Sequence, residues 1–298
     1  MINLTRIFPG ADPFLMRHGG KYYIYCTSEN GQRLDAPNAF NTDSDGRDGF
    51  HVYQSDDLIH WHDAGLCLSR EDVVGNRWFW APEVSFHGGK FYMVYAAEEH
   101  LAMAVADSPV GPFRKHADGW LMDEPAIDGH LLFDDSGIYL YYVELSHGNQ
   151  IHVARMSGDL KRIVHRYPDV LIRAEEPWET RDAIVAEGPF VIRRNGRYYL
   201  SYSCNHTRSR DYAVGYAVAD CPTGPFRKYG HNPILKRHGD VEGVGHNSYM
   251  PTDDPDRFIC AYHCHSGNPD NFKPRMVCLC DAGFAKRDNQ DALWVLSE

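Results

Sequence analysis

Paired apolar segments joined by short turns recur along the chain. Each copy has a polar or small start, an apolar segment, a tight turn and a second segment rich in aromatic residues. The copies read DPFLMRHGGKYYIYCTS, APEVSFHGGKFYMVYAA, DGHLLFDDSGIYLYYVE, EGPFVIRRNGRYYLSYS and, more loosely, HNSYMPTDDPDRFICAYH. Glycine reaches the positive φ that hairpin turns need, and segments of this length that alternate or run apolar are typical of half-buried strands. The pattern therefore predicts five β-hairpins.

The spacing of these hairpins favours a propeller. The copies begin near Asp12, Ala81, Asp128, Glu187 and His246, at irregular intervals close to the length of a propeller blade. A third strand-like segment follows several hairpins, and two copies end in the same five residues, GPFRK. We therefore predict an all-β fold, a five-bladed β-propeller that forms a single catalytic domain over residues 1–298. Segments 30–48 and 170–184 are predicted to be loops, and the first could help to close a pocket.

Composition and charge narrow the choice of partners. The chain has 298 residues, of which 43% are hydrophobic, and its formal net charge is −11, so phosphate backbones would be repelled and nucleic acid is not expected to bind. It contains no apolar run long enough for a membrane span and no basic start followed by an apolar stretch. We therefore expect a cytoplasmic protein without a signal peptide or membrane contact.

The eight cysteines are not the framework of a small disulfide-rich domain in a chain of this size. Most lie in apolar strand-like segments, which favours reduced, buried thiols. Four of them lie between residues 260 and 280, with His263 and His265 between them. In a strand, Cys260 and Cys264 share one face and the two histidines share the other. The usual C-x2-C spacing of zinc sites is absent, so zinc stays an alternative to simple burial.

Candidate chemistry comes from the position that starts each repeat. The first strand of every propeller blade lines the central channel, so equivalent positions meet in space. Counted eight or nine residues before each hairpin glycine, that position holds Asp12, Asp128 and Glu187, with Trp80 or Ala81 and His246 in the other copies. One carboxylate could simply bind backbone N–H groups, but three that converge repel one another and raise a pKa, which is typical of functional sites. Glycoside hydrolysis needs such a set: a protonated acid at the leaving oxygen and an ionised carboxylate on the opposite face.

At these residues the sequence resembles glycoside hydrolase family 43, the arabinan- and xylan-degrading five-bladed propellers. Five motifs occur in the family's order, one in each blade. They are ADPF at 11–14, WAPEV at 80–84, IDGH at 127–130, EGP at 187–189 and GHNS at 245–248. The resemblance implies that Asp12 is the general base, Glu187 the general acid, and Asp128 the residue that tunes and orients that acid. It also implies inversion of configuration, with the acid and base carboxyls roughly 6.5–9.5 Å apart.

The resemblance implies further site residues, each with a plainer alternative. His246 matches a channel histidine beside a calcium ion held mostly by water, or is a hydrogen-bonded core histidine. Arg275 matches an arginine that reaches the pocket, or is a surface residue. Trp80 is a candidate sugar platform, or packs between blades. No cofactor is expected to be required, and calcium is only a candidate structural ion in the central channel.

The implied activity is an exo-acting α-L-arabinofuranosidase on arabinose-containing oligosaccharides. A β-xylosidase and an endo-arabinanase stay open as alternatives, because the sugars place similar hydroxyls and loop lengths do not define the cleft. A carbohydrate-binding propeller without catalysis is the non-enzymatic alternative, although all three carboxylates are present. The sequence leaves the oligomeric state open.

Overall fold

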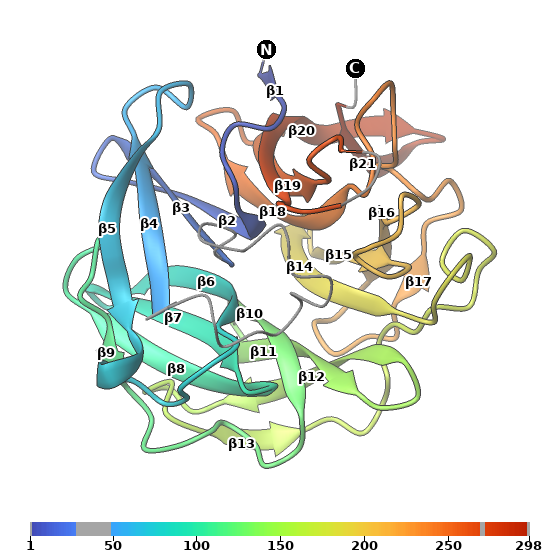
Figure 1. Cartoon of the computed structure of the whole chain (residues 1–298). Coiled ribbons are helices and arrows are strands. Elements are labelled where there is room, and N and C mark those ends of the chain that lie inside the picture. Colours follow the sequence, from blue (N-terminus) through green and yellow to red (C-terminus); the bar gives the residue numbers. More distant parts are fainter. Residues whose placement is uncertain (1, 28–48, 269–271, 297–298) are drawn as a thin grey trace.

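The computed structural model describes residues 2–27, 49–268 and 272–296. Five antiparallel sheets stand around a central axis, as predicted for a five-bladed β-propeller (Figure 1). Blade 1 contains β2 (Ala11–His18), β3 (Lys21–Thr27), β4 (Gly49–Ser55) and β5 (His62–Ser69), followed by the short 3-10 helix η2 (Arg70–Asp72). Blade 2 contains β6 (Trp80–His87), β7 (Lys90–Ala97), β8 (His100–Ala106) and β9 (Arg114–Lys115).

The next two blades repeat this order of neighbouring strands. Blade 3 contains β10 (Ala126–Asp134), β11 (Gly137–Leu145), β12 (Asn149–Met156) and β13 (Ile163–Arg166). Blade 4 contains β14 (Ala186–Arg194), β15 (Arg197–Cys204), β16 (Ala213–Ala219) and β17 (Arg227–Lys228). Blade 5 contains β18 (Gly245–Pro251), β19 (Arg257–Cys264), β20 (Met276–Arg287) and β21 (Gln290–Val295). All five predicted hairpins are therefore confirmed as the first two strands of the blades.

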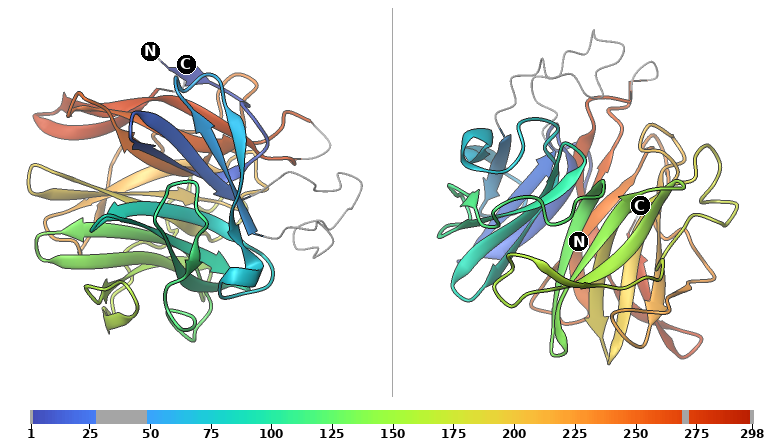
Figure 2. Two further views of the ribbon diagram at one scale, coloured as in Figure 1. Left: turned by 90° about the vertical axis from the view of Figure 1, so that its left-hand side faces the viewer. Right: turned by 90° about the horizontal axis from the view of Figure 1, so that it is seen from below.

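The ring is closed by the N-terminal strand. Strand β1 (Asn3–Leu4) pairs with β20 of blade 5, where Asn3 lies opposite Cys280. Backbone hydrogen bonds extend this pairing, because Ile7 donates to Val277 and Gly10 donates to Arg275. The two chain ends consequently lie near each other on blade 5 (Figure 2). This closure pairs the start of the chain with β20, the strand that follows Arg275, and so brings Arg275 close to Asp12.

The predicted loop at 170–184 is confirmed, since no strand lies between β13 and β14. The predicted loop at 30–48, and its suggested part in closing the pocket, lie outside the described residues. The described part of the chain contains no helix with the length and apolar character needed to cross a bilayer.

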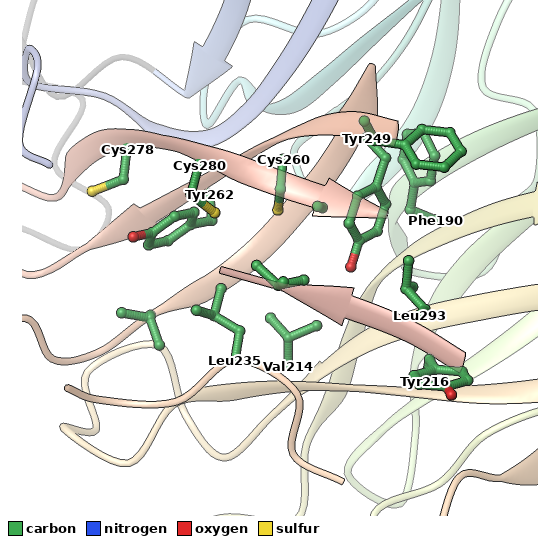
Figure 3. Packing of buried hydrophobic residues seen from close by; sticks show 14 of the residues in the cluster. Phe190, Val214, Tyr216, Leu235, Tyr249, Cys260, Tyr262, Cys278, Cys280 and Leu293 are labelled. Atoms are coloured by element: carbon green, nitrogen blue, oxygen red, sulfur yellow. The ribbon is translucent and has the colours of Figure 1, made fainter. Parts of the chain in front are cut away.

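Each pair of neighbouring blades has its own apolar core. Between blades 4 and 5, aromatic rings such as Tyr216, Tyr249 and Tyr262 pack against aliphatic residues and cysteines (Figure 3). Side chains buried in this way contribute about 1.5–3 kcal/mol each through the removal of apolar surface from water. Because all five interfaces are filled in this manner, the first strands are held rigidly around the axis.

The cysteines of blade 5 belong to this core. All eight cysteines are free thiols, and Cys260, Cys264, Cys278 and Cys280 are completely buried. The sulfur atoms of Cys264 and Cys278 are 3.3 Å apart. His263 points to the other side of the strand, toward Asp12, as the alternation predicts. Among the described residues no three His, Cys, Asp or Glu side chains gather in a way that could hold a metal ion, so the geometry favours burial over zinc.

Candidate active site

A pocket of about 300 Å³ opens at the end of the axis where the first strands begin. All six predicted site residues line it, although they come from all five blades: Asp12, Trp80, Asp128, Glu187, His246 and Arg275. The other lining residues are Thr27, Glu99, Ile127, Leu145, Asn149, Val185, His206, Thr207 and Lys273. Residues far apart in the sequence therefore converge, as the repeat predicted.

A β-bulge near the start of each first strand aims side chains into this pocket. In all five blades the strand register shifts there. One residue of each bulge has a positive φ, between 42° and 58°: Asp12, Ala81, Asp128, Gly188 and His246. This left-handed conformation is strained for Ala and easier for Asp, His and Gly. Bulges of this kind bend a strand and redirect a side chain, and they are common beside active sites.

The bulge positions correct one prediction. Glu187 does not share the structural position of Asp12 and Asp128, because Gly188 occupies that position in blade 4. The prediction counted back from the glycine of each hairpin. In blades 1 and 4 that glycine is the second residue of the turn, but in blade 3 it is Gly137, the first residue of β11. The count of nine residues that reaches Asp128 in blade 3 therefore reaches one residue too far in blade 4. Glu187 instead matches Trp80, which also precedes its bulge residue and also lines the pocket.

Asp12 is held in its ionised form by positive charge. It is 9% exposed, and its Oδ1 lies 3.1 Å from Nη1 of Arg275 and 3.3 Å from Nδ1 of His246. Burial alone would raise the pKa of Asp12, but the charges of Arg275 and His246 hold it well below the usual range. An ionised carboxylate at neutral pH can take a proton from water, which a general base must do.

His263 and Thr207 form a hydrogen-bonded support around Asp12. The backbone N–H of Asp12 donates to Nδ1 of His263 over 3.1 Å, and Nε2 of the same ring lies 3.3 Å from the Thr207 hydroxyl oxygen. Burial lowers the pKa of His263 to about 3, so this ring is neutral. Arg275 also donates to Thr207 over 3.3 Å. Thr207 thus joins the two groups that contact Asp12.

Asp128 and His246 form the floor of the site. Asp128 is 7% exposed, and its Oδ2 accepts the backbone N–H of Gly188 over 3.1 Å. Burial and repulsion from Asp12 raise the pKa of Asp128, although the charge of His246 opposes this. Burial would lower the pKa of His246, but Asp12, Asp128 and Glu187 raise it above the usual value. A protonated imidazole among three carboxyl groups compensates part of their charge.

The surroundings of Glu187 shift its pKa in the opposite direction from that of Asp12. Its Oε1 accepts the Tyr212 hydroxyl over 2.9 Å and its Oε2 accepts an amide N–H of Asn149 over 2.9 Å. Burial and the nearby Asp128 raise the pKa of Glu187 to about 7, although these two hydrogen bonds and His246 oppose the shift. Two carboxyl groups with pKa values pushed apart in one pocket match the acid and base assignment.

The predicted calcium beside His246 can be compared with these contacts. Calcium prefers six to eight oxygen ligands, and no described group of three His, Cys, Asp or Glu side chains could enclose a metal ion. Nδ1 of His246 also faces Asp12 at 3.3 Å and Asp128 at 4.0 Å. A calcium ion here would therefore be held mainly by water, as the resemblance implies, and its presence stays a prediction.

Comparison with known proteins identifies the family. The family model for glycosyl hydrolases family 43 matches residues 7–282. The chain belongs to this family. The crystal structure of an endo-1,4-β-xylanase from Bacteroides thetaiotaomicron is similar, with 36% identity and a TM-score of 0.85 over 99% of this chain and 96% of that one.

Two relatives carry other names. A β-xylosidase of Xylanibacter ruminicola is 29% identical, and the match covers 83% of this chain and 91% of the relative. A β-D-galactofuranosidase of Aspergillus niger is 26% identical over 92% of this chain and 79% of its own. The resemblance stated from the motifs is therefore confirmed, and the protein is a glycoside hydrolase of family 43.

Four residues that support the carboxyl groups were not assigned to this site from the sequence of this glycoside hydrolase. Tyr212 and Asn149 bind Glu187, while His263 and Thr207 support Asp12. The repeat contains a sequence signal that could have identified Tyr212 and Asn149. Asn149 opens the third strand of blade 3 and Tyr212 directly precedes that of blade 4, as Arg275 does in blade 5. The start of the third strand is thus a second position in the repeat that reaches the pocket.

The hydroxyl of Tyr212 gives a testable pH effect in this glycoside hydrolase. A hydrogen bond donated to a carboxylate favours the ionised form, so Tyr212→Phe should raise the pKa of Glu187 further. Because the acid must be protonated to act, activity that wild type loses as the pH rises through about 7 should persist to higher pH in the variant. The measurement is kcat against pH on one oligosaccharide.

The matched control is Tyr262→Phe, whose buried hydroxyl has no hydrogen-bond partner among the described residues. This substitution should leave the fall of kcat at high pH in the same pH range as in wild type. A Tyr212→Phe enzyme that is slower at every pH, with this pH range unchanged, would show that the tyrosine has a packing role alone.

Proposed function

We propose that this glycoside hydrolase removes terminal α-L-arabinofuranosyl residues from arabinose-containing oligosaccharides with inversion of configuration. The observation that carries the proposal is a pair of carboxyl groups in one pocket whose surroundings shift their pKa values in opposite directions, that of Asp12 downward and that of Glu187 upward. Glu187, with its raised pKa, holds a proton for the leaving oxygen. Asp12, with its lowered pKa, is ready to accept a proton from water.

The proton and bond balance of the step is simple. Glu187 donates its proton to the glycosidic oxygen as the bond to the anomeric carbon breaks. Water attacks that carbon from the opposite face, and Asp12 takes the proton that the water loses. Asp128 and His246 contact neither proton directly in this scheme. Asp128 keeps the pKa of Glu187 high by its charge, and His246 balances the carboxylates.

The size of the pocket supports removal of a terminal sugar. Its volume of about 300 Å³ is at the low end of small-molecule sites. A single sugar ring fills such a space, whereas an enzyme that cuts within a polymer needs a groove open at both ends. Trp80 and Ile127 give the pocket an apolar wall, and Asn149 and Lys273 add polar groups for hydroxyls.

A β-xylosidase is the second candidate. The observation that favours it is the naming of similar proteins: a β-xylosidase at 29% identity and an endo-1,4-β-xylanase structure at 36% identity. A terminal xylosyl unit offers hydroxyls like those of arabinose, and the same acid and base would act on it. Cleavage within a polymer, which the second name indicates, fits a pocket of about 300 Å³ less well.

Release of p-nitrophenol from p-nitrophenyl α-L-arabinofuranoside and p-nitrophenyl β-D-xyloside tests the proposal. We expect kcat/KM to be at least about tenfold higher on the arabinofuranoside, which corresponds to about 1.4 kcal/mol in the transition state. The anomer released first, followed by proton NMR, should have the configuration opposite to that of the substrate. The reverse preference would establish the xylosidase, and retention of configuration would contradict the roles of Asp12 and Glu187.

A further inference from the structure

A second concavity lies beside the catalytic pocket, at the same end of blade 4. Its volume is about 280 Å³, nearly that of the catalytic pocket. It is lined by Trp178, Arg181, Asp211, Ala213, Pro233, Lys236 and Arg237. We call it the basic concavity. The residues come from the loop before β14, the turn between β15 and β16 with the first residue of β16, and the segment after β17.

The charge of the basic concavity differs from that of the whole protein. Three cations, Arg181, Lys236 and Arg237, accompany one carboxylate, that of Asp211. Asp211 is shared, because its Oδ1 lies 3.1 Å from Nη1 of Arg181 and 3.5 Å from Nε of Arg237. The site thus has an excess of two positive charges, in a chain whose net charge is −11. Guanidinium groups are over-represented where a carboxylate or phosphate is bound.

The wall of the basic concavity includes an aromatic ring. The half-buried Trp178 donates its indole N–H to Glu176 over 3.0 Å, so the ring presents apolar surface. Gly215 allows this placement, because a Cβ there would lie 2.7 Å from the ring. An apolar wall with a few convergent polar groups is typical of ligand sites.

One polar residue ties the basic concavity to the catalytic pocket. The buried Asn205 accepts the backbone N–H of Arg181 over 2.8 Å and donates to the carbonyls of Trp178 and Asp211. The residues next to Asn205, His206 and Thr207, line the catalytic pocket. The basic concavity and the catalytic pocket therefore lie on either side of a single loop, which the hydrogen bonds of Asn205 hold in place.

We propose that the basic concavity binds the carboxylate of a uronic acid unit, carried by an oligosaccharide whose terminal sugar occupies the catalytic pocket. The inference rests on the proposed function, since it takes the substrate to be a sugar chain. The guanidinium and ammonium groups bind the carboxylate, and the Trp178 ring contacts the apolar face of the sugar. Because of this contact, the enzyme binds plant-type oligosaccharides with an acidic branch more tightly than neutral ones.

Binding to the Glu187→Gln protein tests this without turnover. The two probes are xylotriose that carries one α-L-arabinofuranosyl group and the same oligosaccharide with one glucuronic acid side group added, titrated calorimetrically at low salt. We expect the acidic probe to bind about tenfold more tightly, and this ratio should shrink as salt screens the charges. The double substitution Lys236→Gln/Arg237→Gln should bring the ratio close to one.

The control removes equal charge elsewhere. Lys161→Gln/Arg162→Gln changes two exposed cations in the turn after β12, at the opposite end of blade 3, and should keep the wild-type ratio. A wild-type ratio near one, or a ratio that survives Lys236→Gln/Arg237→Gln, would overturn the proposal. Competition by inorganic phosphate as strong as that by glucuronic acid would also overturn it, in favour of a general anion site. Failure to hydrolyse either aryl glycoside would instead count against the proposed function, because the binding ratio needs no hydrolysis.

Discussion

Replacement of Glu187 by Gln should lower kcat on an unactivated oligosaccharide by about 10²–10⁴-fold. Gln preserves the shape of the side chain and can still contact Tyr212 and Asn149, but it has no proton to give to the leaving oxygen. An aryl glycoside whose leaving group needs little protonation should lose much less activity. The ratio of the two losses, measured with the same protein preparation, reports the acid function of Glu187.

The same variant should change stability in a defined direction. Burial and Asp128 raise the pKa of Glu187 from its ordinary value of 4.5 to about 7, so the folded state binds this proton more tightly than the unfolded state. Stability that depends on this proton is fully present below the unfolded value and is lost as the pH rises through about 7. The Glu187→Gln protein has no proton to lose at this position, so its stability does not fall in this way. The difference between its Tm and the Tm of wild type should therefore grow in its favour as the pH rises from 4.5 to above 7.

Glu144→Gln is a suitable control for both measurements. Glu144 is half-buried in blade 3, where it lies 3.4 Å from Nε2 of His152, and it does not line the pocket. Its substitution should leave kcat near wild type and give no rise in relative Tm over that pH range. Equal losses of Glu187→Gln on both kinds of substrate would remove Glu187 from the role of acid.

Much of the fold could be predicted because the signals are local. Hairpin turns and strand pairs are encoded by neighbouring residues, and five copies reinforce one another. The strand β1 escaped prediction because its partner is β20, at the other end of the chain. Two residues of backbone pairing leave almost no pattern in a sequence.

The residues of the candidate site could also be predicted, because most of them occupy equivalent positions in the repeat. Asp12, Asp128 and His246 all occupy bulge positions of the repeat, so an argument from equivalent positions found them. Glu187 was found despite a register error of one residue, since it too lies at the start of a first strand. The resemblance implied that it carries a proton, but the repeat alone could not predict its raised pKa, because that shift depends on burial and on distances between different blades.

The supporting residues show the limit of such an argument most clearly. His263 was noticed only as part of a group of cysteines and histidines, and strand alternation separated it correctly from the cysteines. Its contact with the N–H of Asp12 joins residues 251 positions apart. No periodicity connects them, since the contact arises from the closure of the ring.

Asp12→Asn should abolish almost all hydrolysis, with kcat/KM reduced by at least about 10³-fold on any glycoside, whatever its leaving group. General acid–base groups contribute about 10²–10⁴-fold, and the base acts on water, so a better leaving group cannot compensate for its loss. This independence of the leaving group distinguishes the base from Glu187. The measurement is kcat/KM on the oligosaccharide and the aryl glycoside, side by side.

The loss must be separated from unfolding. Asp12 and Arg275 form a buried ion pair, and removing one partner of such a pair typically costs about 3–5 kcal/mol. Asp281→Asn is the matched control, because Asp281 is 7% exposed and lies 3.3 Å from Arg257 outside the pocket. Both variants should lower Tm, but Asp281→Asn should keep near wild-type kcat below its unfolding range. A folded Asp12→Asn protein with more than a tenth of wild-type activity would show that another group activates the water.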